Sequence, residues 1–186
     1  TLQYDTIYHE HLRYYSILSL KNLLGRHGFH IFHVTAIPTH GGSVRVYASR
    51  SEAYPVRPSV DEFLRREAEA GLDGESWIEP FRKRVLESKL LLYELLAGIK
   101  RQDKTICGIG APSRSSTLIN YVGLDDGILD SVLEISGSRK IGKFVPGRNI
   151  PVLDEESLYR DQPAYAMLLS WHIGDELCRN LKRRGF

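Results

Sequence analysis

The sequence predicts an α/β fold in which a Rossmann-like parallel sheet with flanking helices is preceded by a helix and a β-hairpin. Two patterns predict this fold. In the second half of the chain, short apolar stretches alternate with amphipathic ones, as in a parallel sheet with helices on its faces. In the first half, two stretches of alternating apolar and polar residues are separated by a glycine-containing turn, as in a hairpin.

The first half of the chain predicts a helix followed by two strands. The helix begins at Ser16 and ends near Gly28, with one apolar face. That face consists of Ile17, Leu20, Leu23 and Leu24. Strands are expected at 29–37 and 43–48, on either side of a turn at 38–42. We expect residues 1–50 to form the end of a preceding domain, or the junction to the next one.

The second half predicts a linker and then alternating helices and strands. Residues 51–58 contain two prolines and little apolar pattern, which is typical of a linker, and residues 59–186 form the expected Rossmann-like domain. Ser59 and Glu62 match a capping box at the start of its first helix. The expected helices are 59–71, 76–100, 113–122, 154–160 and 173–184, and the expected strands are 104–109, 131–135, 149–153 and 164–169.

Composition excludes several classes of protein. The 186 residues are 42% hydrophobic and 26% charged, with a formal net charge of +2, which predicts neither a nucleic-acid nor a membrane partner. No apolar run is long enough to span a membrane. Cys107 and Cys178 form no disulfide framework, which favours a cytoplasmic location. The chain begins at Thr1 rather than at a methionine, and we expect it to be part of a longer chain.

A glycine-rich turn at 105–117 leads from a predicted strand into a predicted helix. Gly110 permits a tight turn, and the amides at the helix start, with the side chains of Arg114, Ser115, Ser116 and Thr117, are suitable donors for an anion such as a phosphate. The pattern lacks the third glycine of the dinucleotide fingerprint. The residues alone are equally consistent with a nucleotide site and with a tight connection capped by serines.

Further polar residues follow the next strands. Glu134 ends one strand, where a carboxylate could bind ribose hydroxyls. Lys140 and Lys143 belong to a basic loop just beyond it, and His172 follows the last strand. Carboxyl ends of parallel strands share one edge of the sheet, where ligands bind in open α/β folds, so we expect an anionic ligand there. A solvated loop and a helix cap are the alternatives.

The segment Tyr8-His9-Glu10-His11 places four side chains that can exchange protons in consecutive positions. A carboxylate beside an imidazole can fix its tautomer and raise its basicity, which suits a general base. A metal site is less favoured because no further ligands follow at supporting spacing. A polar surface loop is as consistent with the spacing as catalysis. His40, beside two glycines that give close backbone access, is a further candidate, and a plain hairpin turn is the favoured interpretation of these residues by themselves.

Taken together, several segments resemble the carboxy-terminal region of the S-adenosylmethionine-dependent NDP-sugar C-methyltransferases. The matching segments are Tyr4 to His11, Thr39 to Tyr47, Gly108 to Tyr121, Lys140 to Gly147 and Ser170 to His172. They keep the family order and cover nearly the whole chain. Two departures are Arg114, where the family often has lysine, and Ser115-Ser116, where Gly-Asn is common.

The resemblance implies a three-part enzyme that methylates a carbon of a nucleotide-linked 4-keto-sugar. An amino-terminal module would hold zinc, a central domain would bind S-adenosylmethionine, and this chain would contact those domains of its own polypeptide. His11 is the implied catalytic base, supported by Tyr8 and Glu10. The implied substrate-binding residues are His40, Gly110, Arg114, Ser115, Ser116, Lys140, Lys143 and His172. No metal site is expected in this chain.

Two other functions fit the sequence. One is a Rossmann-like module that binds a nucleotide or a sugar nucleotide without catalysing a reaction. The other is an NAD-linked oxidoreductase domain, against which the missing third glycine argues. The first alternative differs from the enzyme in whether Tyr8 to His11 lie at the same edge of the sheet as Gly110.

Overall fold

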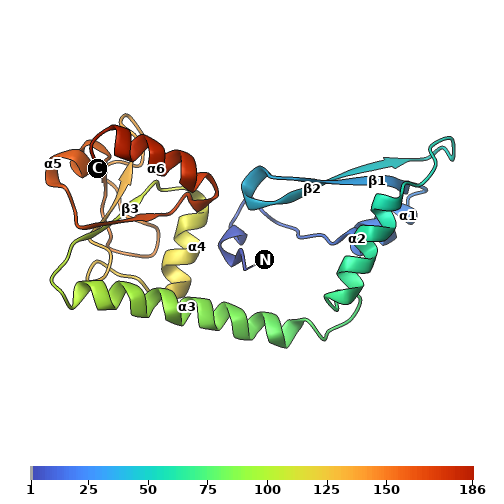
Figure 1. Cartoon of the computed structure of the whole chain (residues 1–186), viewed down its shortest axis with the longest axis horizontal. Helices are drawn as coiled ribbons and strands as arrows, with labels where there is room; N and C mark the ends of the chain where they lie inside the picture. Colours follow the sequence, from blue (N-terminus) through green and yellow to red (C-terminus); the bar gives the residue numbers. More distant parts are fainter. Residues whose placement is uncertain (1) are drawn as a thin grey trace. The chain divides into compact units, whose positions relative to one another are not determined.

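The computed structural model describes residues 2–186, which form two compact units. The sheet unit contains residues 2–11 together with Arg84–Phe186, and the hairpin unit contains Leu12–Lys83. Helix α3 (Ile78–Lys100) begins in the hairpin unit and continues in the sheet unit (Figure 1). The first residues of the described chain therefore pack with its second half.

The sheet unit contains four parallel strands in the order β5-β4-β3-β6. They are β3 (Ile106–Ile109), β4 (Ser131–Glu134), β5 (Val152–Asp154) and β6 (Tyr165–Leu168). The helices between and after them are α4 (Ser113–Val122), α5 (Glu156–Asp161) and α6 (Gly174–Arg183). The predicted α/β class, with a helix and an antiparallel hairpin before a parallel sheet, is confirmed.

Two apolar layers cover opposite faces of this sheet. On one face, Leu96 of α3 and Ile119 of α4 pack against Val132 of β4. On the other face, Leu158 of α5 lies against Cys107 of β3, with α6 beside it (Figure 1). The central strands β3 and β4 are largely buried between these layers, and their residues form short apolar runs, whereas Leu153 of β5 and Tyr165 of β6 are exposed.

The strand order creates a topological switch point. From β3 the chain moves outward through β4 to β5, and it then crosses to the other side of β3 to form β6. The connections that leave β3 and β6 therefore lie on opposite faces of the sheet, next to the carboxyl ends of these two strands. Ligands bind at such a position in doubly wound folds.

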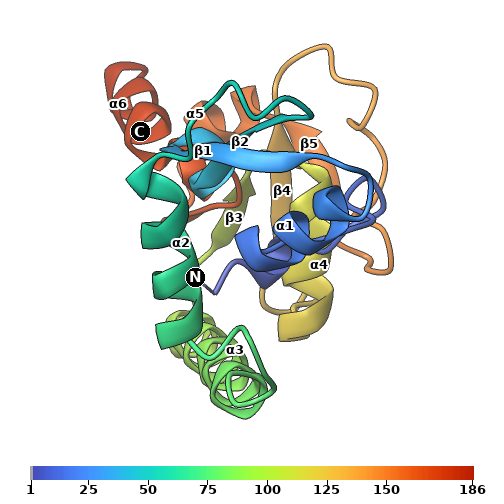
Figure 2. The ribbon, with the colours of Figure 1, turned by 90° about the vertical axis from the view of Figure 1, so that its right-hand side faces the viewer.

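The hairpin unit consists of two helices packed against an antiparallel hairpin (Figure 2). Its strands are β1 (His30–Ile37) and β2 (Ser43–Ser49), joined by the 3-10 turn η2 (Thr39–Gly41). Its helices are α1 (Ile17–Gly25) and α2 (Pro58–Glu69). Ile17, Val34 and Val60, from three of these elements, are buried together in its core.

The capping box expected at Ser59 is wrong. Helix α2 begins at Pro58, its N-cap is Arg57, and that cap forms no side-chain hydrogen bond. The Ser59 hydroxyl is instead hydrogen bonded to His33 Nδ1 at 2.7 Å and accepts the backbone N–H of Val34 at 3.3 Å. The Ser59 hydroxyl, which the local pattern predicted to cap the helix, is therefore hydrogen bonded to strand β1 instead.

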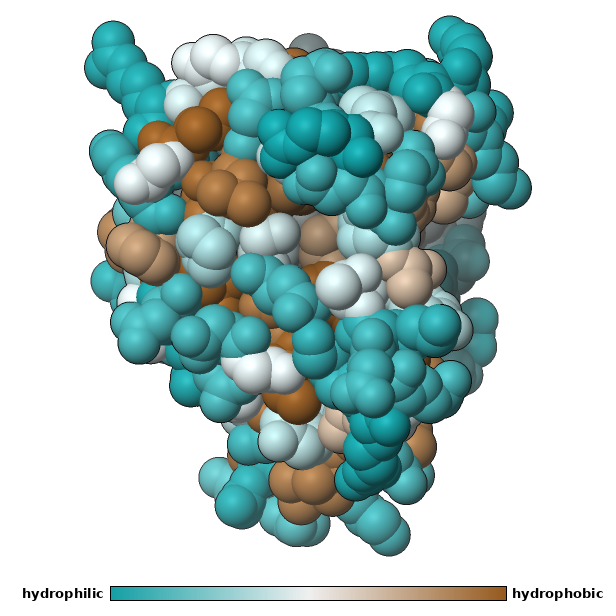
Figure 3. Space-filling view, turned by 90° about the vertical axis from the view of Figure 1, so that its left-hand side faces the viewer, coloured by the Kyte–Doolittle hydropathy of each residue, from teal (hydrophilic) through white to brown (hydrophobic). Residues whose placement is uncertain are grey.

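The molecular surface mixes hydrophilic side chains with smaller apolar patches, as seen on the face shown in Figure 3. Some of the exposed apolar side chains belong to α3, including Leu90, Leu91 and Leu95. Within residues 2–186, no helix combines the length and the apolar character that crossing a membrane requires.

Candidate functional site

The turn after β3 is shaped by a glycine at a position where other residues would be strained. Gly110 has a φ of +82°, and its N–H donates to the carbonyl of Leu133 at 2.7 Å. A Cβ atom at Gly110 would lie 2.9 Å from Ser170 Oγ. The turn therefore brings the backbone close to the connection that follows β6, and it delivers the chain directly to Pro112, the N-cap of α4.

Glu134, at the end of β4, holds this turn in place. Its carboxylate accepts the N–H of Ala111 and that of Ile135, each at 3.1 Å. Lys140 Nζ lies 3.4 Å from the same carboxylate and donates to the carbonyl of Ala111 at 2.6 Å. The acidic residue that the sequence suggested for ribose binding thus stabilises the turn with Oε2, while Oε1 accepts the N–H of the next residue, Ile135.

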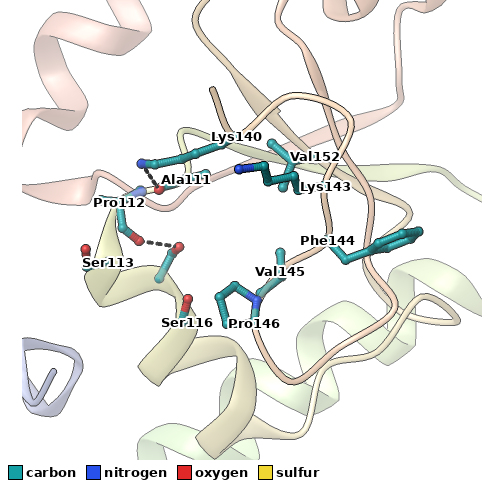
Figure 4. A pocket seen from close by; sticks show the side chains of 11 residues that line it. Ala111, Pro112, Ser113, Ser116, Lys140, Lys143, Phe144, Val145, Pro146 and Val152 are labelled. Carbon is teal, nitrogen blue, oxygen red and sulfur yellow. Dashed lines mark hydrogen bonds between the residues drawn. The ribbon is translucent and has the colours of Figure 1, made fainter. Parts of the chain in front are cut away.

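A pocket of about 210 Å³ opens beside the turn, between the start of α4 and the loop that follows β4 (Figure 4). Its lining residues are Ala111, Pro112, Ser113, Ser115, Ser116, Lys140, Lys143, Phe144, Val145, Pro146 and Val152. In Figure 4 the Lys143 ammonium points into the pocket, whereas the Phe144 ring points away from it.

The chemistry of this pocket suits an anion. Two lysines line it and no acidic side chain does, and Lys143 forms no ion pair with any described residue. The first turn of α4 contributes the backbone N–H groups of Ser113 and Arg114 and the positive end of the helix dipole, whereas the N–H of Ser115 donates to the carbonyl of Pro112 at 2.9 Å. The hydroxyl of Ser115 is already used, because it donates to the carbonyl of Pro112 at 2.7 Å. Ser113 and Ser116 supply the remaining hydroxyl groups on this wall.

The Tyr8–His11 segment contains an ordered pair of side chains. His11 Nδ1 lies 3.0 Å from the carbonyl oxygen of Thr6, and His11 Nε2 lies 3.0 Å from the hydroxyl of Tyr8. Because a carbonyl can only accept, Nδ1 carries the proton in the neutral ring and Nε2 is the basic atom, which accepts the Tyr8 hydroxyl. The neighbouring side chains of His9 and Glu10 are exposed and lie 3.9 Å apart.

A buried ion pair just before this segment joins the first residues of the chain to α4. Arg114 Nε donates to Asp5 Oδ2 at 2.7 Å, and each side chain is only 7% exposed. Trp171 Nε1 donates to the same oxygen at 2.9 Å, and the Arg114 guanidinium lies over the Trp171 ring at 4.8 Å. His172 Nδ1 is 3.4 Å from Arg114 Nη1. Asp5 is therefore held at the switch point, between the start of α4 and the connection after β6.

The structure brings most of the sequence-predicted site residues to one edge of the sheet. Ser115, Ser116, Lys140 and Lys143 line the pocket next to the Gly110 turn. Arg114 and His172 lie at the buried ion pair and not in the lining of the pocket. Glu10 lies at the surface, and His40 belongs to the hairpin unit, in η2, with a φ of 54°.

Two residues in this region were not singled out as site residues from the sequence, namely Asp5 and Trp171, and Thr117, suggested as an anion donor, has another partner. Asp5 is 109 positions from Arg114 and 166 from Trp171, and no local spacing indicates such pairs. The Thr117 hydroxyl donates to the carbonyl of Ile7 at 2.6 Å. Within residues 2–186, no group of three or more His, Cys, Asp and Glu side chains is arranged to hold a metal ion.

Comparison with known proteins gives two findings. Residues 38–185 match the family described as the C-methyltransferase C-terminal domain. The chain is also similar to the C-methyltransferase NovU of Streptomyces niveus, with 34% identity over 181 residues. That alignment covers 97% of this chain and 43% of NovU, so the chain spans less than half the length of this relative.

Proposed function

Because the chain belongs to the C-methyltransferase C-terminal domain family, we propose that it is the carboxy-terminal portion of an S-adenosylmethionine-dependent enzyme that methylates a carbon of a nucleotide-linked 4-keto-sugar. The observation that carries the proposal is the ordering of the His11 ring, which leaves Nε2 as a basic atom. Asp5, three residues before Tyr8, is held at the switch point of a doubly wound sheet, where this class of fold binds ligands.

His11 is the proposed catalytic base. The C–H bond beside the ketone breaks, its proton moves to His11 Nε2, and the electron pair passes to the ketone oxygen as an enolate. In the structure the Tyr8 hydroxyl donates to Nε2 and orders the ring, so it must turn away before Nε2 can accept the substrate proton, and Glu10 adds negative charge nearby in sequence. S-adenosylmethionine supplies an electrophilic methyl group, whose bond to sulfur breaks as the enolate carbon attacks it.

The pocket beside α4 is the proposed site of the diphosphate. Lys143 and Lys140 supply positive charge, and Ser116 and the amides at the start of α4 supply hydrogen-bond donors. The pocket and the Asp5–Arg114 ion pair both adjoin the first turn of α4. A sugar linked to the bound diphosphate would therefore extend from this helix end toward the Tyr8–His11 segment.

The methyl donor does not fit the pocket beside α4. S-adenosylmethionine carries a positive sulfonium centre, whereas the pocket is lined by two lysines and by no acidic side chain. We therefore place donor binding in a central domain outside this chain, and zinc in an amino-terminal module that is also outside it. As part of the same proposal, the protein is cytoplasmic, and its partners are the nucleotide sugar and the other domains of its own polypeptide.

Substituting each histidine of the segment in the full-length enzyme tests the proposal. His11→Asn removes the base, and His9→Asn is a matched control because His9 is 76% exposed and two positions away. We expect His11→Asn to lower kcat by about 10²–10⁴-fold with little change in the KM for the nucleotide sugar. His9→Asn should stay near wild type.

Two outcomes would contradict the assignment. Full turnover in His11→Asn would require another group to take the proton. Nucleotide-sugar binding by the full-length protein without any methyl transfer would favour the alternative, a binding module that catalyses no reaction. The two outcomes are separated by measuring binding and turnover on the same preparations.

A further inference from the structure

Helix α4 presents two neighbouring stripes of side chains to different partners. Ser113, Ser116 and Asn120 form one stripe at i, i+3 and i+7, and the first two line the anion pocket. Asn120 Nδ2 continues the stripe by donating to the carbonyl of Pro146, another lining residue, at 2.9 Å. The side chains on this side of α4 therefore line the pocket or bind a residue that lines it.

The second stripe, Arg114, Thr117 and Tyr121, has the same spacing and holds the amino-terminal segment. Arg114 binds Asp5, Thr117 donates to the carbonyl of Ile7, and the Tyr121 ring lies 5.0 Å from that of Tyr4. These contacts follow residues 4–7 along the length of the helix.

The anchored stretch includes the atom that orients the His11 ring. Thr6 lies between Asp5 and Ile7, and its carbonyl oxygen accepts the His11 Nδ1 proton. The Thr6 hydroxyl also donates to the carbonyl of Gln3 at 2.7 Å, which adds local order. Any displacement of Asp5 therefore moves the acceptor that fixes the tautomer of His11.

Arg114 is not available to bind a phosphate in this arrangement. Its Nε is bonded to Asp5, its Nη1 faces His172, and its Nη2 is shielded from solvent with no hydrogen-bond partner among the described residues. It does not line the pocket in which the Lys143 ammonium lies.

We infer that Arg114, Asp5 and Trp171 are positioning residues, which hold the Tyr8–His11 segment on α4 at a fixed place relative to the diphosphate pocket. This inference rests on the proposed function and deepens it. One helix then sets the separation between the bound diphosphate and the catalytic base, and the ion pair acts on catalysis through His11 rather than through contact with the substrate.

Two conservative variants and a matched control test this inference. Arg114→Lys keeps the charge but loses the planar donor group, and Asp5→Asn keeps an acceptor for Trp171 but loses the charge. Arg160→Lys is the control, because Arg160 Nε also lies 2.7 Å from an aspartate oxygen, of Asp161, while the two side chains are 70% and 55% exposed. Thermal unfolding confirms that each variant is folded.

Two readouts are compared. In the full-length enzyme we expect the Arg114 and Asp5 variants to lower kcat by about 10–100-fold, with the KM for the nucleotide sugar within about twofold of wild type. In this chain, long-range ¹H–¹⁵N spectra of the His11 ring should show the Nδ1-protonated tautomer in the wild type and in Arg160→Lys. The same spectra should show a tautomer mixture in Arg114→Lys and Asp5→Asn.

If a variant does not fold, Thr117→Val supplies the test, since it removes only the hydroxyl that donates to Ile7, and it should shift the His11 spectrum in the same direction. A weaker affinity for a nucleoside diphosphate with an unchanged His11 spectrum would overturn the inference and make Arg114 a phosphate ligand. That result would leave the proposed base intact. The assignment of His11 as the base is tested separately, by the turnover of the His11→Asn variant.

Discussion

The Asp5–Arg114 ion pair gives a prediction about stability. Both side chains are 7% exposed, so Arg114→Gln leaves the Asp5 carboxylate almost out of water with Trp171 as its remaining side-chain donor. Breaking a buried pair by removing one partner costs about 3–5 kcal/mol of the free energy of unfolding. With an m-value of about 2 kcal/mol/M, that cost lowers the urea midpoint by about 1.5–2.5 M.

Tryptophan fluorescence can follow this loss in the sheet unit alone. The chain has two tryptophans, and Trp77→Phe leaves Trp171, whose indole donates directly to Asp5. Urea titration of this background with Arg114→Gln is compared with the same background carrying Arg160→Gln, in which an exposed pair of the same type is broken. We expect Arg114→Gln to lower the urea midpoint strongly and Arg160→Gln to leave it unchanged.

A double variant sharpens the comparison. Adding Asp5→Asn to Arg114→Gln removes the stranded charge, so the double variant should be less destabilised than the sum of the two single variants. A urea midpoint for Arg114→Gln as close to wild type as that of Arg160→Gln would refute the view that this pair anchors residues 4–7 on α4.

The other predictions concern the pocket, the donor and the thiols. Lys143→Ala should weaken binding of a nucleoside diphosphate in titration calorimetry, and added salt should diminish the difference, because Lys143 supplies charge to the pocket. The chain alone should not bind S-adenosylmethionine, and micromolar affinity in calorimetry would contradict that expectation. Burial raises the pKa of the Cys107 thiol from 9.0 to about 11, whereas Cys178 is exposed, so a thiol reagent at pH 8 should modify Cys178 first. Since unfolded Cys107 releases its proton at lower pH than folded Cys107, the free energy of unfolding should fall as pH rises from about 9 to about 11, measurable by urea titration.

Much of the fold follows from local pattern. The helix expected at 113–122 is α4 with the same bounds, because the glycine turn, Pro112 and the following polar face all specify its start. The four predicted strands of the parallel sheet are present, and the central ones, β3 and β4, are buried enough to leave a short apolar run between turn residues. The capping error at Ser59 has the opposite cause, a tertiary partner that competes with a local one.

Part of the site was also predictable from local pattern. The Gly110 turn and the basic loop share a sheet edge because parallel strands place their carboxyl ends together, and the structure brings Ser116, Lys140 and Lys143 around one pocket. The attachment of residues 2–11 to the sheet unit was not predictable. It depends on contacts of Asp5 with Arg114 and Trp171, which are separated from it by more than half of the chain length. No spacing pattern in a single sequence indicates contacts between residues so far apart.

The central claim, that His11 removes a proton beside the ketone, is tested most directly by deuterium exchange. The full-length enzyme is incubated with a nucleotide-linked 4-keto-sugar in D₂O without a methyl donor, and incorporation beside the ketone is followed by NMR. The account predicts exchange by the wild type and by His9→Asn, and exchange slowed by about 10²-fold or more in His11→Asn. Exchange at the wild-type rate in His11→Asn, or its loss only in His9→Asn, would contradict the account.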